Sequence, residues 1–214
     1  TDFPTTNGSY QEVSIQNTSS TSRQADGFIS LISADGSTIE KSTYISTPNY
    51  DQVYFVEFDR FNNVYGYGQT EAGLLFPRLR APVANPGAGQ FIVKLDRNLD
   101  SLEFSTTFGN GNGTGRVNIS PTAFLVDQCQ NIYAAGWGGR LVPAEGDKNI
   151  TNMPLIRDTS YGTINSSAFY LYVINRNIDS VLFATFIGGS NSDDHVDGGT
   201  SRFDKNGVVY HSVC

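Results

Sequence analysis

Three aspartates are the residues whose type and spacing could most readily do chemistry, because they recur at equivalent places in the chain. They are Asp59, Asp127 and Asp204, and each is followed six residues later by a tyrosine, Tyr65, Tyr133 or Tyr210. Carboxylates gathered at one face of a repeated sheet could act as the acids and bases of a hydrolase. Each aspartate also opens a tight turn, where its side chain normally accepts hydrogen bonds from backbone amides. We therefore predict structural turn residues, and keep a hydrolase as an alternative.

A second acidic group lies at 190–199, in the sequence SNSDDHVDGG. It gathers Asp193, Asp194, His195 and Asp197, which offer oxygen donors suited to calcium and one imidazole. The spacing matches neither an EF-hand loop nor the calcium-binding nonapeptide repeat. The pattern favours a solvated, turn-rich loop, and no metal site is predicted.

Two further patterns fail as catalytic or cofactor motifs. The glycine-rich sequence GNGNGTG at 109–115 is followed by no predicted helix that could bind a phosphate at its N-terminus, so it predicts a flexible turn. His195 and His211 are the only histidines, and no Ser-His-Asp order of a known hydrolase surrounds them. The sequence predicts no catalytic residue and no cofactor.

Trp137 is the only tryptophan, and we expect it at the start of a long loop over 137–166. An exposed indole there would suit stacking on a sugar, although packing between neighbouring sheets is the commoner fate of a tryptophan. Trp137 is therefore the candidate glycan-stacking residue, and a carbohydrate-binding propeller that also uses Tyr161 and Tyr170 is an alternative that ranks ahead of the hydrolase.

The two cysteines, Cys129 and Cys214, fit no metal-binding spacing and are too few for a disulfide framework. They occupy non-equivalent places in the repeat described below. A disulfide needs two Cα atoms within about 7 Å, so we predict no bond between them.

Two kinds of recurring hairpin must position these residues. The aspartates belong to hairpins predicted over 53–68, 121–136 and 200–213. A second set is predicted over 27–45, 90–108 and 169–187, and its members superpose without a gap at offsets of 63 and 79 residues. Phe28 falls on Phe91 at the first offset, and Asp100 falls on Asp179 at the second.

The two sets alternate along the chain, which gives four strands per repeat of 60 to 80 residues. Such a period is typical of a β-propeller, a ring of four-stranded antiparallel blades, whereas a β-sandwich needs no aligned repeat. We predict about three blade repeats over 26–214 and an inter-blade connector over 1–25. Three blades are too few to close a ring, so we expect them to be part of a larger propeller. Long insertions at 69–88 and 137–166 are the expected functional surface.

Composition narrows the classes of partner. A net charge of −7 and a pI of about 4.7 argue against nucleic acid, which attracts clustered basic residues. No apolar run approaches the roughly 18 residues that cross a bilayer, so a membrane-spanning chain is not expected. The Asn-, Thr- and Ser-rich, Lys-poor composition is typical of an exported surface protein.

Three related motifs recur in the chain: STYI at 42–45, STTFGN at 105–110 and ATFIGGS at 184–190. Together with the three Asp-to-Tyr hairpins, they resemble the bacterial β-propeller repeat called SBBP. The repeats here are longer than usual, and Asn62-Asn63 and Gln130-Asn131 replace the family's Gly-Asn in two turns. Asn tolerates positive φ, so these turns stay feasible.

Two segments, AGWGG at 135–139 and the run from His195 to Cys214, are similar to parts of very large surface proteins of gliding Bacteroidetes. This resemblance implies export by the type-nine secretion system to the outer cell surface. It also implies a non-enzymatic scaffold or interaction module, related to adhesion or gliding, with protein or glycan partners. Ser101 and Ser180 resemble the Asp-Ser-apolar motif at which such proteins are O-glycosylated, and are the candidate modification sites.

Overall fold

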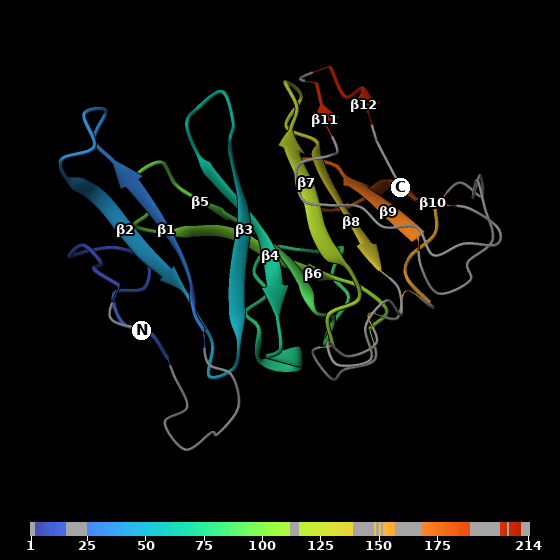
Figure 1. The fold of residues 1–214 in the computed structure, drawn as a ribbon, viewed down its shortest axis with the longest axis horizontal. Coiled ribbons are helices and arrows are strands. Elements are labelled where there is room, and N and C mark those ends of the chain that lie inside the picture. The colour runs from blue at the N-terminus through green and yellow to red at the C-terminus, as the bar shows by residue number, and fades with distance from the viewer. Residues whose placement is uncertain are drawn as a thin grey trace.

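A computed structural model describes residues 3–15, 25–111, 116–138, 148, 150, 152–156, 168–188, 202–204 and 206–210 (Figure 1). Its regular elements are β-strands apart from one 3₁₀ turn, η1 (Gly73–Leu75). In this part of the chain no helix is long and apolar enough to cross a membrane. The all-β class and the four-stranded antiparallel sheets are confirmed.

Two sheets are complete four-stranded meanders in which each strand pairs with the next along the chain. Unit 2 consists of β3 (Asp51–Phe58), β4 (Val64–Thr70), β5 (Gln90–Leu95) and β6 (Leu102–Phe108). Unit 3 consists of β7 (Ser120–Val126), β8 (Ile132–Gly138), β9 (Ala168–Ile174) and β10 (Val181–Ile187).

Two half units flank them. Unit 1 is the hairpin of β1 (Gly27–Ile32) and β2 (Ile39–Ile45), and unit 4 is the hairpin of β11 (Arg202–Phe203) and β12 (Val209–Tyr210). Figure 1 shows units 1 and 4 at opposite ends of the row of sheets. All six predicted hairpins are therefore present and antiparallel.

The offsets seen in the sequence are retained in the backbone. Gly36, Leu99 and Ile178 lie at equivalent places in the turns of the second hairpin set, and all have positive φ, at 73°, 59° and 58°. The Leu99 and Ile178 side chains are buried, so this turn directs an apolar residue into the core. The aspartate hairpins behave alike: Asn62, Gln130 and Gly207, each three residues after its aspartate, have φ of 65°, 65° and 82°.

Neighbouring units pack face to face through aromatic side chains. Between units 2 and 3, the Tyr67 ring lies 5.5 Å from that of Phe124, and Phe108 stacks on Tyr172 at 4.4 Å. The buried hydroxyl of Tyr67 donates to the carbonyl of Ala135 at 3.2 Å. A second core joins unit 1 to unit 2 and includes Ile29.

The long connectors cover the outermost strand of each unit. Leu79 exchanges two backbone hydrogen bonds of 3.0 Å with Ser105 of β6, and Ile156 pairs in the same way with Ala184 of β10. In unit 1, the amide of Thr6 donates to the carbonyl of Ser42 at the equivalent place on β2. The segments predicted as a connector and as functional loops therefore satisfy an edge that would otherwise stay open.

The same connectors reach the following unit. Four residues after its edge contact, the amide of Tyr10 donates to the carbonyl of Leu99 at 2.8 Å. At the same spacing, the amide of Val83 donates to the carbonyl of Ile178 at 2.9 Å. Consecutive units are thus joined by a repeated backbone contact as well as by their cores.

Candidate functional site

The three recurring aspartates accept hydrogen bonds within their own turns. Oδ1 of Asp59 accepts from the amides of Phe61 and Asn63, at 2.9 and 3.0 Å, and Oδ2 accepts from the Asn63 side chain at 3.0 Å. Asp127 accepts from the amide and the side chain of Asn131, at 2.8 and 2.9 Å. Asp204 accepts from the amides of residues 206 and 208.

The tyrosine that follows each of the first two aspartates by six residues bonds to the same carboxylate. The hydroxyl of Tyr65 donates to Asp59 at 3.4 Å, and that of Tyr133 donates to Asp127 at 3.3 Å. In these two hairpins the Asp-to-Tyr spacing therefore places the tyrosine hydroxyl on the carboxylate that opens the turn. This explains the repetition of the pattern without a shared active site.

Unit 2 adds a cation to this arrangement. The Lys94 ammonium lies 3.3 Å from the Asp59 carboxylate and 2.9 Å from that of Glu103, and 5.2 Å from the centroid of the Tyr65 ring. Its equivalent in unit 3 is Val173.

The electrostatics of this group keep its charges fixed. Burial raises the pKa of Asp59, but the hydrogen bonds from Asn63 and Phe61 and the charge of Lys94 outweigh it, so the pKa lies below its ordinary value. Burial lowers the pKa of Lys94, but Glu103 and Tyr65 outweigh it, so that pKa lies above its ordinary value. Burial raises the pKa of Tyr65 to about 12. Groups with these pKa values do not exchange protons near neutral pH, which makes them poor general acids or bases.

A second polar cluster, which the sequence analysis missed, lies where unit 1 meets unit 2. Asp51 is fully buried; its Oδ2 accepts two 2.6 Å hydrogen bonds from the amide and hydroxyl of Thr47. Its Oδ1 has no hydrogen-bond partner among the described residues. The hydroxyl of Ser46, the residue before Thr47, donates to the carboxylate of Asp26 at 2.8 Å.

Burial, with a smaller contribution from the charge of nearby Asp26, raises the pKa of Asp51 to about 6, against the opposing effect of its hydrogen bonds. One signal could have revealed this cluster: Asp26 stands where the other repeats have Gly89 and Ala168. The protonation of Asp51 is therefore expected to change near neutral pH, at a buried position where the two units meet.

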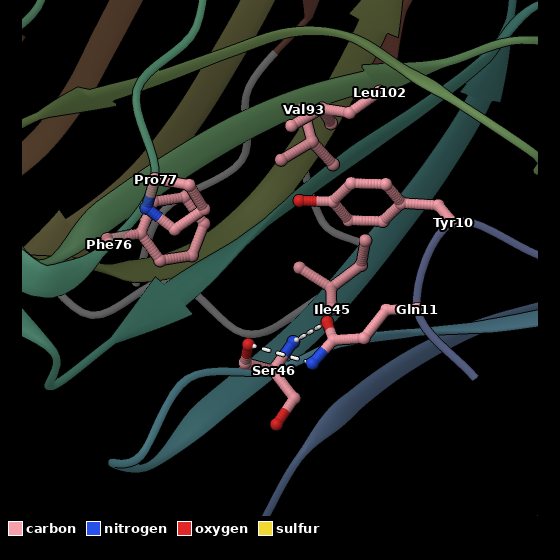
Figure 2. A pocket seen from close by; sticks show the side chains of 8 residues that line it. All are labelled: Tyr10, Gln11, Ile45, Ser46, Phe76, Pro77, Val93 and Leu102. Carbon is pink, nitrogen blue, oxygen red and sulfur yellow. Dashed lines mark hydrogen bonds between the residues drawn. The ribbon is translucent and has the colours of Figure 1, made fainter. Parts of the chain in front are cut away.

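The pocket at the same seam is small. Figure 2 shows the Tyr10 ring between the core side chains of units 1 and 2, with Gln11 bonded to Ser46 beside it. The remaining volume is about 10 Å³, about the space of one water molecule. Small-molecule sites usually measure about 300 Å³ or more, so this pocket is a packing seam.

Trp137 lies within β8 and not in a loop, which corrects its expected place. The ring is partly buried beside the core that contains Phe169, and the Lys148 ammonium lies 5.6 Å from its centroid. Tyr170 is fully buried and donates to the carbonyl of Pro154, so its predicted role in glycan stacking is wrong. Tyr161 lies outside the described residues.

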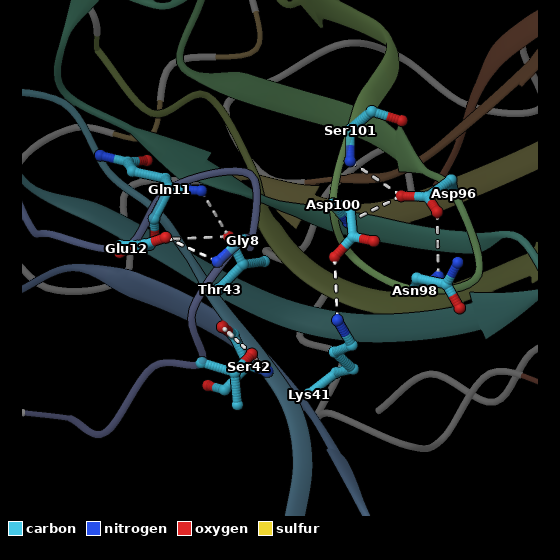
Figure 3. A network of polar contacts seen from close by, with 11 residues as sticks. Gly8, Gln11, Glu12, Lys41, Ser42, Thr43, Asp96, Asn98, Asp100 and Ser101 are labelled. Carbon is cyan, nitrogen blue, oxygen red and sulfur yellow. Dashed lines mark hydrogen bonds and ion pairs between the residues drawn. The ribbon is translucent and has the colours of Figure 1, made fainter.

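Ser101 and Ser180 are exposed at equivalent turn exits. In Figure 3, Oδ1 of Asp96 accepts from the amides of Asp100 and Ser101, at 2.7 and 2.8 Å, and Lys41 of β2 pairs with Asp100 at 3.1 Å. Asn175 takes the place of Asp96 in unit 3 and accepts from the amide of Ser180 at 3.2 Å. Both serines thus stand on ordered turns, accessible to a modifying enzyme.

Several predicted residues lie outside the described part of the chain: Asp193, Asp194, His195, Asp197, His211, Cys214 and 112–115. Cys129 is a free, exposed thiol in the turn after Asp127, and the absence of a bond to Cys214 stays a prediction. The described residues contain no group of three or more His, Cys, Asp or Glu side chains that could hold a metal ion.

Comparison with known proteins gives no match to a family model or to a curated protein.

Proposed function

We propose that the chain is a run of β-propeller blades that serves as a non-enzymatic scaffold and interaction module of an exported bacterial surface protein. Two four-stranded meanders side by side, joined by cores and repeated connector contacts, are what successive blades require. The SBBP-like motifs favour a bacterial surface protein over other propeller classes.

The observation that carries this proposal is that the recurring aspartates are hydrogen-bonded within their own hairpins. Asp59 and Asp127 are engaged by turn amides and by their own tyrosines. A hydrolase would need at least one of these carboxylates directed at a substrate, with a pKa suited to proton transfer. Their hydrogen bonds therefore favour the scaffold over the hydrolase.

A protein partner could bind at the tip of the β3–β4 hairpin. Phe61 is exposed there, and the Arg60 guanidinium lies 4.8 Å from the centroid of its ring. Arginine and aromatic side chains are enriched in binding hot spots. The equivalent positions in unit 3, Gln128 and Cys129, lack this pair, so unit 3 does not repeat the tip of unit 2.

Binding of the labelled chain to the envelope of the producing bacterium, and to a glycan array, tests this function. The double variant Arg60→Ala, Phe61→Ala should bind the envelope at least tenfold more weakly. Leu75→Ala, at another exposed apolar position, is the matched control and should bind normally. Glycan binding that Trp137→Ala abolishes would favour the carbohydrate-binding alternative. Hydrolysis lost in a folded Asp59→Asn, Asp127→Asn, Asp204→Asn variant would overturn the scaffold proposal.

The surface assignment also leads us to propose O-glycosylation of Ser101 and Ser180. Mass measurement on peptides from natively produced protein should show added hexose-type mass on both. Ser105, whose buried hydroxyl donates to the carbonyl of Pro77 at 2.6 Å, is the internal control and should be unmodified. Unmodified Ser101 and Ser180 would remove this proposal and weaken the surface assignment.

A further inference from the structure

The dipeptide Asn7-Gly8 stands at the tip of an exposed turn in the connector that covers β2. The carbonyl of Thr6 accepts from the amide of Ser9 at 3.2 Å, and Gly8 has a φ of 79°. Asn7 and Gly8 are both exposed. Among the residues that the structure describes, no heavy atom lies within 4 Å of the place where a Cβ on Gly8 would stand. The carboxamide of Asn7 therefore has room to turn toward the following peptide group.

An asparagine that precedes a glycine can react with its own backbone. The glycine nitrogen attacks the carbonyl carbon of the asparagine side chain, a cyclic imide forms, and the side-chain nitrogen leaves as ammonia. Glycine favours this step because it has no Cβ to obstruct the ring. The peptide N–H must lose its proton before its nitrogen can attack, so the reaction depends on a base.

Glu12 places a carboxylate on that proton. The amide of Gly8 donates to Oε1 of Glu12 at 2.6 Å (Figure 3). A general base acts from about 2.6–3.2 Å of the atom that gives up the proton, so the contact lies in this range. Glu12 is itself held on the turn, because the hydroxyl of Thr5 donates to its carbonyl at 2.7 Å.

A second site in the chain, Asn206-Gly207, has the same dipeptide with a different acceptor. Gly207 has a φ of 82°, close to that of Gly8. Its amide donates to the backbone carbonyl of Asp204 at 3.0 Å. A peptide carbonyl does not take up a proton near neutral pH, whereas a carboxylate can. The two sites thus share their sequence and the glycine conformation, and differ in what accepts the glycine proton.

We propose that Asn7-Gly8 is a self-modifying site, at which Glu12 removes the Gly8 amide proton and converts Asn7 to aspartate or isoaspartate. The bond from the Gly8 nitrogen to Cγ of Asn7 forms as the bond from Cγ to Nδ2 breaks. The proton moves from the Gly8 nitrogen to Glu12 and leaves with Nδ2 as ammonia. Water then opens the ring, and gives aspartate where the new bond breaks and isoaspartate where the original peptide bond breaks.

The conversion loosens the connector. Backbone bonds of Thr6 and Gln11 anchor the two sides of the turn on β2. Isoaspartate adds a carbon atom to the main chain between these anchors, and either product puts a new carboxylate beside Glu12, where like charges repel. The bond from the amide of Tyr10 to the carbonyl of Leu99, which joins this connector to unit 2, should therefore open more often.

Peptide mass mapping of the purified chain, after timed incubation at neutral pH, tests the reaction, because a carboxyl in place of an amide changes the peptide mass. Asn7 should convert at least about tenfold faster than Asn206. Glu12→Gln should remove this advantage, since glutamine still accepts a hydrogen bond but is not a base. Glu40→Gln, at an exposed carboxylate of β2, is the matched control and should keep the wild-type rate. Circular dichroism checks that both variants are folded.

A hydrogen bond can also hold an amide in place and slow this reaction. In that case Glu12→Gln would convert Asn7 as fast as the wild type or faster, and this result would overturn the role of Glu12. Equal rates at Asn7 and Asn206 in the wild type would overturn the site itself.

Hydrogen exchange tests the consequence for the connector. The Tyr10 amide should exchange faster in the converted chain than in the fresh chain. Asn7→Gln is the control, because its longer side chain cyclises more slowly, and it should keep its protection through the same incubation. Equal protection of Tyr10 before and after conversion would overturn the loosening. These assays use no partner and no cells, so their outcome is independent of the proposed function.

Discussion

The ammonium group of Lys94 lies 3.3 Å from the carboxylate of Asp59, whose side chain is fully buried. Asp127 accepts the same two bonds from the asparagine four residues on, with Val173 in the place of Lys94, but it is partly exposed. The aspartate turn therefore forms with the carboxylate alone. A cation such as Lys94 is required only where that carboxylate is buried away from water. Lys94 offsets the cost of burying the charge of Asp59.

Replacing Lys94 with Met should therefore destabilise the fold. The change keeps the length of the side chain but leaves the ionised Asp59 without its cation, which we expect to cost about 1–3 kcal/mol. Urea unfolding of the wild type and the variant measures this difference.

Lys41→Met is the control, because the ion pair of Lys41 with Asp100 is exposed to solvent. Such pairs contribute about 0–1 kcal/mol. Adding Asp59→Asn to Lys94→Met should recover part of the loss, since it removes the unpaired charge. Equal effects of the two lysine changes would contradict this account of Lys94.

Asp51 should make stability depend on pH. Its pKa is about 6 in the folded chain and near 3.8 when unfolded, so the folded state holds the proton more tightly. The resulting stabilisation is fully present below about pH 4 and is lost as the pH rises through 6. Over that window the shift corresponds to about 3 kcal/mol. Urea unfolding at several pH values between 4 and 7 should show the fall.

Asp51→Asn should remove this fall, because an amide does not titrate and its oxygen can still accept the bonds from Thr47. Asp35→Asn is the control: hydrogen bonds from Ser33 and Ser37 lower the pKa of Asp35 to about 2, so it stays ionised throughout the window. The control should keep the wild-type slope. A slope that survives in Asp51→Asn would assign the titration to another group.

The hairpins could be predicted from sequence because their information is local. The offsets of 63 and 79 residues locate the turns of the second hairpin set. One position in these turns has a similar positive φ in all three hairpins, although it holds glycine, leucine and isoleucine in turn. The aspartate turns were equally predictable, since the carboxylate bonds to amides only two and four residues away.

The connectors and the Asp51 cluster were not predictable in this way. Leu79 pairs with Ser105 through backbone groups, which leave no side-chain pattern in the sequence. The high pKa of Asp51 depends on burial between two units, and no spacing encodes that. The glycines beside Trp137 favour a loop in the sequence, whereas in the structure β8 continues through Trp137 to Gly138.

The turn after Asp127 should accept a stabilising glycine. Gln130 has a φ of 65°, a conformation that costs a residue with a side chain about 1–2 kcal/mol, and its side chain is not part of the buried core. Gln130→Gly relieves this strain but also increases the conformational entropy of the unfolded chain, which offsets part of the gain. We therefore expect a net increase of about 0.5–1 kcal/mol in the free energy of unfolding. Asn62→Gly, at the equivalent place in unit 2, is the matched control, and its gain should be smaller because asparagine tolerates this conformation. Urea unfolding of both variants measures the difference, and an equal or larger gain in Asn62→Gly would show that strain at Gln130 is not what the glycine relieves.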